Sequence, residues 1–163
     1  MKFLLFIKTP TPLGDMLLEA DNSGLCGAWF CGQKHCPPSV DGLAPSPQND
    51  ILQKAALELA DYFAQKLRVF TVPVSLDGTP FQMRVWKELL KIPYGETVSY
   101  GDIAHALKLG GLGARAVGGA VGRNPVSVIV PCHRVIGKDG SLTGYGGGID
   151  KKKSLLGLEG LNL

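Results

Sequence analysis

The length, composition and charge of the chain exclude several classes of protein. Its 163 residues suit one domain or two small ones, and an apolar content of 45% is enough for a hydrophobic core. The net charge of +3 permits a nucleic acid as partner without requiring one. The four cysteines do not form a secreted disulfide framework. The apolar run 3–7 ends at Lys8, too early for a signal peptide or a membrane span. We therefore expect a cytoplasmic protein with no membrane partner.

The first 76 residues have the pattern of a small sheet followed by a helix. Turn residues separate three short apolar runs, which predicts an antiparallel meander. These runs are residues 3–7, 16–20 and 25–30. Residues 32–49 contain four prolines and are expected to form a loop. Apolar residues recur at helical spacing over 50–67, with Asp50 as the expected N-cap. Residues 70–76 are expected to be extended, at a sheet edge or in a linker, because they include Pro73.

Asp77-Gly78 marks the best domain boundary, and a helical pattern follows it. We expect an N-terminal supporting α/β domain over 1–76 and a C-terminal domain over 77–163. Thr79, Pro80 and Gln82 have the spacing of an N-cap, a first helical residue and a capping box. They predict a helix that ends near Ile92.

Further helices and a strand are expected after this first helix. Two helices are predicted, from Ser99 to about residue 110 and from Gly113 to Asn124. A strand over 126–136, a turn at 137–140 and a strand at 141–142 would add a β-wing to this helix-turn-helix. A short helix over 151–158, capped by Asp150, closes the chain. The fold class predicted is α+β: an antiparallel sheet with a helix, then a winged helix-turn-helix-like domain.

The segment 114–121 has an unusual composition for a helix. It contains Gly118 and Gly119 in succession, and each interior glycine costs about 1 kcal/mol relative to alanine. Either these small residues pack closely against another helix, or their face contacts a nucleic-acid backbone, with Arg115 as its one long side chain. The second helix of a helix-turn-helix normally enters DNA, but this one lacks side chains that read the major groove. We expect minor-groove binding with little sequence preference.

A polar triplet interrupts the apolar stretch 128–136. Cys132 is followed directly by His133 and Arg134. The thiolate is the nucleophilic form of cysteine, and a neighbouring proton acceptor or positive charge promotes its formation. From these residues alone, Cys132 is either an activated nucleophile or a buried structural thiol.

Residues 79–159 contain an ordered set of short motifs. They are Phe81-Gln82 with Val85-Trp86, the run from Ile92 to Thr97, Ser99-Tyr100, Ile103-Ala104, the run from Ala114 to Gly118, Asn124-Pro125, the run from Pro131 to Val135, Gly144-Tyr145, and Leu155-Leu156 with Glu159. In order and spacing, this set closely resembles the O6-alkylguanine-DNA alkyltransferases, also called methylated-DNA–protein-cysteine methyltransferases. Over residues 1–76 the resemblance is looser, limited to Gly24-Leu25, Trp29-Phe30 and the strand-then-helix plan.

The resemblance implies direct repair of alkylated DNA. Such a protein binds double-stranded DNA, flips an O6-alkylguanine out of the stack and takes the alkyl group onto a cysteine, which inactivates the protein. O4-alkylthymine is a second implied substrate class. By position, Cys132 is the nucleophile, His133 is the base acting through a water, and Glu159 orients His133. No cofactor or metal is implied. A monomer is expected, with assembly along DNA left open.

By the same resemblance, other residues bind the DNA and the flipped base. Arg115 would fill the gap left by the flipped nucleotide. Tyr100 would crowd the adjacent phosphate and donate a hydrogen bond to the guanine ring, and Asn124 would join the recognition helix to the active-site segment. The helix face against DNA would be Ala114, Gly118 and Gly119. The pocket would be Val135, Tyr145, Gly146 and Ser127, with the Gly146 N–H serving guanine O6.

The chain departs from the family pattern at two places. The turn 109–113 before the recognition helix is one residue longer than usual and lacks the usual proline. This predicts a flexible or differently placed turn, with an effect on DNA affinity. Ser127 and Gly146 stand where some members carry proline and serine. Smaller groups at these two positions predict room for bulkier O6-alkyl groups.

The N-terminal cysteines raise the question of a zinc site. Cys26, Cys31, His35 and Cys36 are suitable ligand types, but structural zinc sites usually have closely paired ligands. Cys26 and Cys31 are five residues apart on an expected strand, hence on opposite faces. We expect no zinc site here.

Two other functions compete with alkyl transfer. A winged-helix protein that only senses alkylated DNA is one, although relatives of that kind lack the reactive cysteine. A cysteine hydrolase built on Cys132 and His133 is the other, and it would turn over many times. The number of alkyl groups transferred per protein molecule separates these hypotheses.

Overall fold

The computed structural model of the chain describes residues 4–37 and 44–163. The chain divides into two compact units, Met1–Asp77 and Gly78–Leu163. The predicted loop 32–49 lies partly outside the described residues. Within the described part, no helix is both long and apolar enough to span a bilayer.

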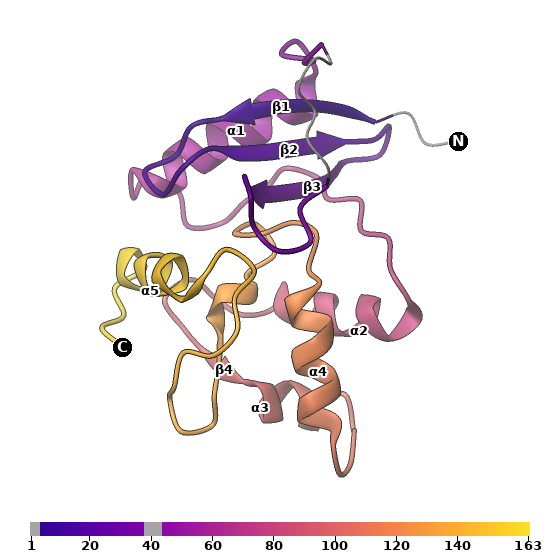
Figure 1. The fold of residues 1–163 in the computed structure, drawn as a ribbon, viewed down its shortest axis with the longest axis vertical. Helices are drawn as coiled ribbons and strands as arrows, with labels where there is room; N and C mark the ends of the chain where they lie inside the picture. Colours follow the sequence, from indigo (N-terminus) through magenta and orange to yellow (C-terminus); the bar gives the residue numbers. More distant parts are fainter. Residues whose placement is uncertain (1–3, 38–43) are drawn as a thin grey trace. The chain divides into compact units, whose positions relative to one another are not determined.

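The first unit is a three-stranded antiparallel sheet with one helix. Strands β1 (Leu5–Thr9), β2 (Met16–Ala20) and β3 (Leu25–Phe30) pair in the order β1-β2-β3, which confirms the predicted meander. Helix α1 (Asp50–Phe63) lies along one face of this sheet (Figure 1). Its buried face consists of Leu52, Ala55, Glu58, Leu59 and Tyr62.

The two ends of α1 differ from the prediction. Asn49 is the N-cap, because its side chain accepts a hydrogen bond from the Leu52 N–H at 3.0 Å, and Asp50 is the first helical residue. The helix ends at Phe63 rather than Leu67. An N-cap prediction is uncertain by one residue wherever two capping residue types adjoin, as Asn49 and Asp50 do here.

A buried carboxylate fastens the end of the first unit to α1. Glu58 accepts hydrogen bonds from the N–H groups of Thr71 and Val72, at 2.9 and 2.8 Å, and from the Thr71 hydroxyl at 2.6 Å. Beyond them, Leu25 of β3 donates to the Pro73 carbonyl and accepts from the Ser75 N–H, both at 2.8 Å. The segment 70–76 therefore runs along the sheet edge, as its proline predicts.

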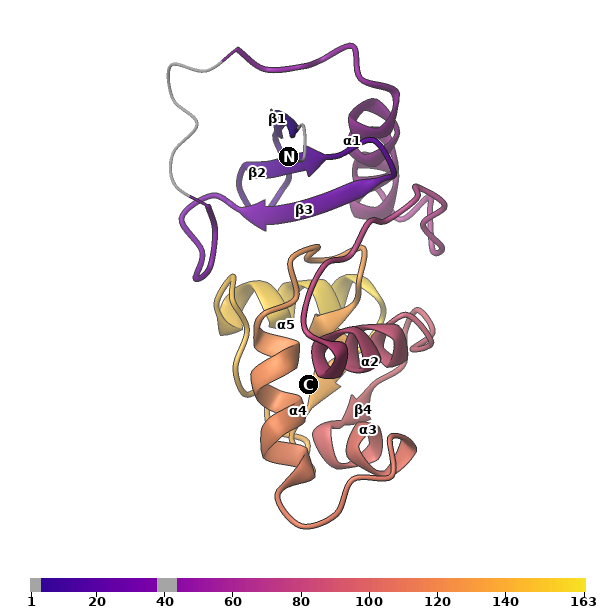
Figure 2. The ribbon, with the colours of Figure 1, turned by 90° about the vertical axis from the view of Figure 1, so that its right-hand side faces the viewer.

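The second unit is mainly helical. Helix α4 (Gly113–Gly122) packs against α2 (Pro80–Leu89) and α3 (Tyr100–Ala106), as Figure 2 shows. The buried Trp86 indole donates to the Ala120 carbonyl at 2.9 Å and so ties α2 to α4. Helix α5 (Ile149–Leu158) closes the unit, and two short strands, β4 (Val98–Ser99) and β5 (Val135–Ile136), pair in parallel.

Local capping chemistry accounts for the starts of α2 and α3 in this unit. Thr79 with Gln82 caps α2, and Ser99 with Asp102 caps α3, each as a complete capping box. The Thr79–Gln82 box confirms the prediction. At α5 the predicted cap was wrong. Asp150 lies inside the first turn, and Gly148, at a φ of 99°, precedes the helix without a side-chain cap.

The predicted strand over 126–136 was wrong for most of its length. Residues 127–129 form a turn and Val130 a bend, Cys132–Arg134 form a short 3-10 helix, η1, and only Val135–Ile136 form a strand. The reason is Asn124, whose amide accepts from the Val126 N–H at 3.0 Å and donates to the Val130 carbonyl at 2.8 Å. One side chain thus supplies hydrogen bonds that a neighbouring strand would otherwise make.

The predicted β-wing is also absent as a pair of strands. The turn at 137–140 is closed by hydrogen bonds from the Gly137 N–H to the Ser141 carbonyl and from the Gly140 N–H to the Gly137 carbonyl. No strand follows at 141–142 in the described residues. The loop from residue 137 to 148 therefore leads to α5 without a sheet.

Candidate active site

Cys132 is the first residue of η1 and is buried, with 7% of its surface exposed. Burial raises the pKa of the Cys132 thiol. The Asn124 amide, the Lys152 charge and the backbone N–H groups of Cys132 and His133 oppose this increase without cancelling it. The resting residue is therefore a protonated thiol, and it needs a base before it can act as a nucleophile.

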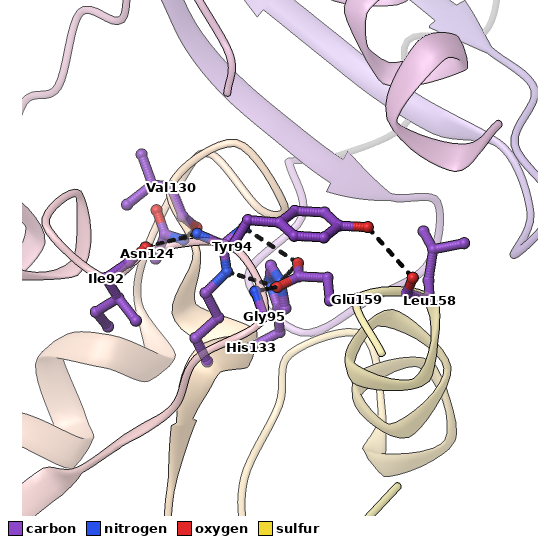
Figure 3. A network of polar contacts seen from close by, with 9 residues as sticks. Ile92, Tyr94, Gly95, Asn124, Val130, His133, Leu158 and Glu159 are labelled. Atoms are coloured by element: carbon purple, nitrogen blue, oxygen red, sulfur yellow. Dashed lines mark hydrogen bonds and ion pairs between the residues drawn. The ribbon is translucent and has the colours of Figure 1, made fainter. Parts of the chain in front are cut away.

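His133 is completely buried and contacts the carboxylate of Glu159. The distance from Nε2 to Glu159 Oε2 is 2.7 Å (Figure 3). Burial lowers the pKa of His133, although Glu159 acts in the opposite direction, so the imidazole is neutral. Because an ionised carboxylate only accepts hydrogen bonds, Nε2 carries the proton and Nδ1 does not. Nδ1 is buried without a hydrogen-bond partner among the described residues. It is an available proton acceptor next to Cys132 in the chain.

Glu159 follows α5 directly and is held by several donors besides His133. Arg134 donates to it from Nε at 2.8 Å and from Nη2 at 3.1 Å, and the Gly95 N–H donates at 3.0 Å. Burial alone would raise the pKa of Glu159, but the hydrogen bonds from His133 and Arg134 hold it well below its usual range. Arg134 also donates to the Ile92 carbonyl at 2.7 Å. The positive charge expected next to Cys132 from Arg134 is therefore directed to Glu159.

Lys152 is the residue that sequence reasoning missed. It is fully buried in α5, and its Nζ donates to the carbonyls of Val135 at 2.5 Å and Thr143 at 3.0 Å. Burial lowers its pKa to about 8, so the ammonium group is mostly protonated at neutral pH. One signal was available: Lys152 lies three residues before Leu155, on the apolar face of the closing helix.

The predicted pocket residues lie in two segments on either side of η1. Ser127 and Val135 are buried, whereas Tyr145 and Gly146 are half-buried in the loop before α5. Burial raises the pKa of Tyr145 well above its ordinary value, with a further contribution from Cys132 and a partial offset by Ser127. Tyr145 therefore interacts with both Cys132 and Ser127.

Tyr100 begins α3 and reaches the same loop. Its hydroxyl donates to the Thr143 carbonyl at 2.9 Å, and its ring lies 6.0 Å from Lys152 Nζ. Burial raises the pKa of Tyr100, and Cys132 contributes in the same direction. Tyr100 thus belongs to the surroundings of the thiol, with its proton already engaged.

The predicted DNA-binding face lies on α4. Ala114, Arg115 and Gly119 are exposed, and Gly118 is half-buried beside Tyr100. A methyl group at Gly119 would meet nothing within 4 Å, and one at Gly118 would meet only the Tyr100 ring, at 3.8 Å. Close packing within the described chain therefore does not explain Gly119, which leaves the alternative that this face approaches a partner.

Charge is distributed unevenly between the two units. Residues 78–163 contain eleven Lys and Arg against six Asp and Glu, whereas residues 1–77 contain six against eight. The basic excess therefore belongs to the unit that contains the helix-turn-helix, as expected where DNA phosphates are bound. Among the described residues, no group of three or more His, Cys, Asp or Glu side chains is arranged to hold a metal ion.

The packed helices α3 and α4, a buried thiol next to a His–Glu pair and an excess of basic residues are the features expected of a DNA-binding protein that reacts through a cysteine. Residues 80–161 match the family model described as 6-O-methylguanine DNA methyltransferase, DNA binding domain. Residues 4–76 match the model described as 6-O-methylguanine DNA methyltransferase, ribonuclease-like domain. The chain belongs to the methylated-DNA–protein-cysteine methyltransferase family, in its N-terminal part as well as its C-terminal part.

Relatives from bacteria and archaea cover almost the whole chain. The methylated-DNA–protein-cysteine methyltransferase of Mycobacterium tuberculosis is 49% identical over 149 residues, which is 91% of this chain and 88% of the relative. That of Methanosarcina acetivorans is 43% identical over 150 residues, 92% and 94% of the two chains.

Solved structures agree with these sequence matches. The crystal structure of M. tuberculosis O6-methylguanine methyltransferase has a TM-score of 0.85 and 46% identity, covering 96% of this chain and 93% of the other. The crystal structure of M. tuberculosis OGT in complex with DNA has a TM-score of 0.83 and 47% identity, covering 96% and 91%.

Proposed function

We propose that this chain repairs DNA by transferring the alkyl group of O6-alkylguanine to Cys132. The observation that carries the proposal is the buried Cys132–His133–Glu159 arrangement in a chain of this family. Neither the thiol nor the imidazole is charged before substrate binds, so the free protein contains no reactive thiolate at Cys132.

The reaction begins with movement of the thiol proton. The proton passes from Cys132 through a water to Nδ1 of His133, and Glu159 stabilises the imidazolium that forms. The thiolate attacks the alkyl carbon, a carbon–sulfur bond forms and the carbon–O6 bond breaks. Its electron pair goes to guanine O6. The ring takes a proton at N1 from water, and His133 returns the proton it received to the solvent. A thioether has no route back to the thiol here, so each molecule reacts once.

Recognition of the base uses the loop and turns around η1. The flipped guanine would lie against Val135, Tyr145, Gly146 and Ser127, with the Gly146 N–H directed to O6. Tyr100 would have to exchange its bond to the Thr143 carbonyl for one to the guanine ring, because a hydroxyl has one proton to donate. O4-alkylthymine is a second substrate of the same chemistry, and the small Ser127 and Gly146 leave room for larger alkyl groups.

DNA binding is assigned to the second unit. The face of α4 that contains Ala114, Gly118 and Gly119 would enter the minor groove, and Arg115 would occupy the gap left by the flipped nucleotide. Asn124 connects this helix to the active-site turns through its bonds to Val126 and Val130. Residues 1–76 would support the domain of residues 77–163. The protein would act as a monomer on double-stranded DNA, in a reducing compartment such as the cytoplasm.

Counting transferred groups tests the proposal. The protein is incubated with an excess of duplex DNA containing O6-methylguanine, and its intact mass is measured over time. We expect a gain of one methyl group per molecule, a plateau at that value, and no gain in Cys132→Ser. Cys36→Ser, which changes a thiol of the first unit, is the matched control and should react like the wild type.

Other outcomes identify the competing functions. Continued loss of alkyl groups from DNA well beyond one per protein would indicate a hydrolase. Binding to the lesion without any gain in mass would indicate a sensor of alkylated DNA. Either result would overturn the transfer to Cys132. Replacing the methyl by a benzyl group in the same assay tests whether the pocket accepts larger alkyl groups. A strict preference for methyl would reject that prediction.

A further inference from the structure

We propose that Leu112 is an apolar contact to DNA: its side chain enters the minor groove beside Arg115 and packs against the sugars and bases there. The inference rests on the proposed function, because it extends the DNA-binding face assigned to α4. Leu112 lies outside the ordered motifs of the sequence and outside the face that contains Ala114, Gly118 and Gly119.

The fold gives no structural reason for a leucine at position 112. Its side chain is 75% exposed, the highest fraction of any large apolar residue in the described part of the chain. Leu112 directly precedes α4, at the position where a side-chain oxygen commonly caps a helix, and it makes no side-chain cap bond. It therefore contributes neither to the core nor to the helix start. A single exposed leucine is ordinary by itself, so its surroundings decide what it can bind.

The turn before α4 is fixed on its inner side and leaves Leu112 on its outer side. The Gly113 N–H donates to the Gly110 carbonyl at 3.0 Å, and Gly111 has a φ of 57°. Gly113 is buried, and a methyl group on it would lie 2.6 Å from Cβ of Leu109. Leu109 and Gly113 therefore anchor the turn to its own unit. In Figures 1 and 2 the turn projects beyond the two helices that it joins.

The charges around the turn favour a polyanionic partner. Residues 103–138 include no Asp or Glu, and Lys108, Arg115 and Arg123 within this range are exposed. Leu112 follows Lys108 by four residues and precedes Arg115 by three. An apolar side chain between two cations suits a DNA groove, where phosphates flank sugars and base edges. Proteins that bind the minor groove frequently insert leucine or another apolar side chain between base steps.

Two variants of similar size separate polarity from shape. Leu112→Met keeps an apolar side chain, Leu112→Gln replaces it by a polar one, and Leu57→Gln changes an exposed leucine of α1 as the matched control. Affinity for an undamaged duplex is measured by fluorescence anisotropy at about 50 and 200 mM NaCl. We expect Leu112→Gln to bind about tenfold more weakly than the wild type, because the buried apolar contact is lost. Leu112→Met should stay within about twofold of the wild type, and Leu57→Gln should match it.

The salt dependence identifies the kind of contact. An apolar side chain releases no counterions, so the deficit of Leu112→Gln should be the same at both salt concentrations. Its midpoint temperature of unfolding and its reaction with free O6-benzylguanine should equal those of the wild type, because the side chain is on the surface. Wild-type affinity in Leu112→Gln would overturn the proposal, and so would an equal loss in Leu112→Met. A deficit that disappears at the higher salt concentration, or slower reaction with the free base, would overturn it as well.

A second measurement uses the wild-type protein itself. The leucine methyl groups are labelled with 13C, and the signals of Leu112 are identified by their absence in Leu112→Met. Saturation with an undamaged duplex should shift these signals, because the methyl groups then lie beside base rings, and should leave those of Leu57 in place. Unshifted Leu112 signals would overturn the proposal. A wild type that binds DNA but takes no methyl group from O6-methylguanine would instead overturn the proposed function, and both Leu112 measurements would still be interpretable.

Discussion

The two units of the chain each bury a glutamate, and the two carboxylates are satisfied in different ways. Glu58 in the first unit accepts from two backbone N–H groups and from the Thr71 hydroxyl. Glu159 in the second unit accepts from His133 and Arg134, and from one backbone N–H. Hydrogen bonds hold the pKa of both carboxyls below the ordinary value against the opposing effect of burial.

The difference lies in what the partners can do. The partners of Glu58 have no change of protonation state near neutral pH, so its carboxylate only fastens residues 71–72 to α1. One partner of Glu159 is an imidazole, which gains a proton in the proposed reaction and is stabilised by the carboxylate when it does. A buried charge therefore indicates function where its partner titrates, and stability where its partners are backbone groups.

Replacing each glutamate by glutamine gives the largest expected effects. Glu159→Gln leaves Arg134 buried without an anion and removes the stabilisation of the His133 imidazolium. We expect a loss of about 3 kcal/mol in the free energy of unfolding. We also expect methyl transfer to slow roughly a hundredfold. Urea denaturation and single-turnover transfer to Cys132 measure the two quantities.

Glu58→Gln is the matched change in the first unit. It weakens hydrogen bonds to the backbone and should cost about 1–2 kcal/mol of stability. The transfer rate of the folded protein should equal that of the wild type. Equal slowing in both variants would show that the contrast between the two carboxylates is one of stability alone.

The next largest effect concerns the repair rate when a basic residue of the second unit or of the first unit is removed. Arg115→Ala should slow repair of duplex DNA roughly tenfold, because the flipped nucleotide then returns to the stack more easily. Its reaction with free O6-benzylguanine, where nothing is flipped, should be unchanged. Lys66→Ala removes one exposed positive charge from the first unit and should affect neither substrate. Equal losses of Arg115→Ala on both substrates would reject the role in base flipping.

Much of the fold follows from local sequence signals. The three strands of the meander and the starts of α2 and α3 are where turn residues and capping boxes place them. These signals act within four residues, so they can be recognised without knowing the tertiary structure. The ordered motifs also indicated the family, because the spacing of many short motifs is more specific than any one of them.

The active-site segment could not be predicted in the same way. An apolar β-branched run such as 126–130 is typical of a buried strand, but the Asn124 amide satisfies its backbone groups and turns it instead. The partner of Arg134 lies 25 residues away, and that of Lys152 lies 17 residues away. Interactions over such separations leave no periodicity in the sequence, so the sequence could not show that Arg134 binds Glu159 and that Lys152 binds the Val135 carbonyl.

Acid should distinguish the two units by the pH at which each begins to lose stability. Burial lowers the pKa of His133, so below its ordinary value of about 6.5 the unfolded chain binds a proton that the folded chain does not. Stability should therefore begin to fall at pH 6.5 because of the second unit. The lowered pKa of Glu58 removes stability from the first unit only below about 4.5. Thermal unfolding from pH 7.5 to 5 measures this decline.

In His133→Gln the midpoint temperature of unfolding should change less between pH 6.5 and 5 than in the wild type, since the titrating group is gone. Transfer activity gives a second test of the same pKa. The wild type should stay active below pH 6.5 and lose activity only as His133 itself becomes protonated. An activity that falls with a midpoint at or above pH 6.5 would contradict the neutral imidazole.

The last comparison between the units concerns two glycines, and glycine is required for a different reason at each. In the first unit, a methyl group on Gly24 would lie 2.7 Å from the Pro73 carbonyl oxygen, so Gly24→Ala should cost about 1–3 kcal/mol of stability. Gly119 on α4 has open space around it, and alanine should stabilise the helix by up to about 1 kcal/mol. If the α4 face approaches DNA, Gly119→Ala should nevertheless bind duplex DNA more weakly while reacting normally with free O6-benzylguanine. Fluorescence anisotropy and the single-turnover assay measure these quantities. A Gly119→Ala variant that gains stability and binds DNA as tightly as the wild type would show that this face does not contact DNA.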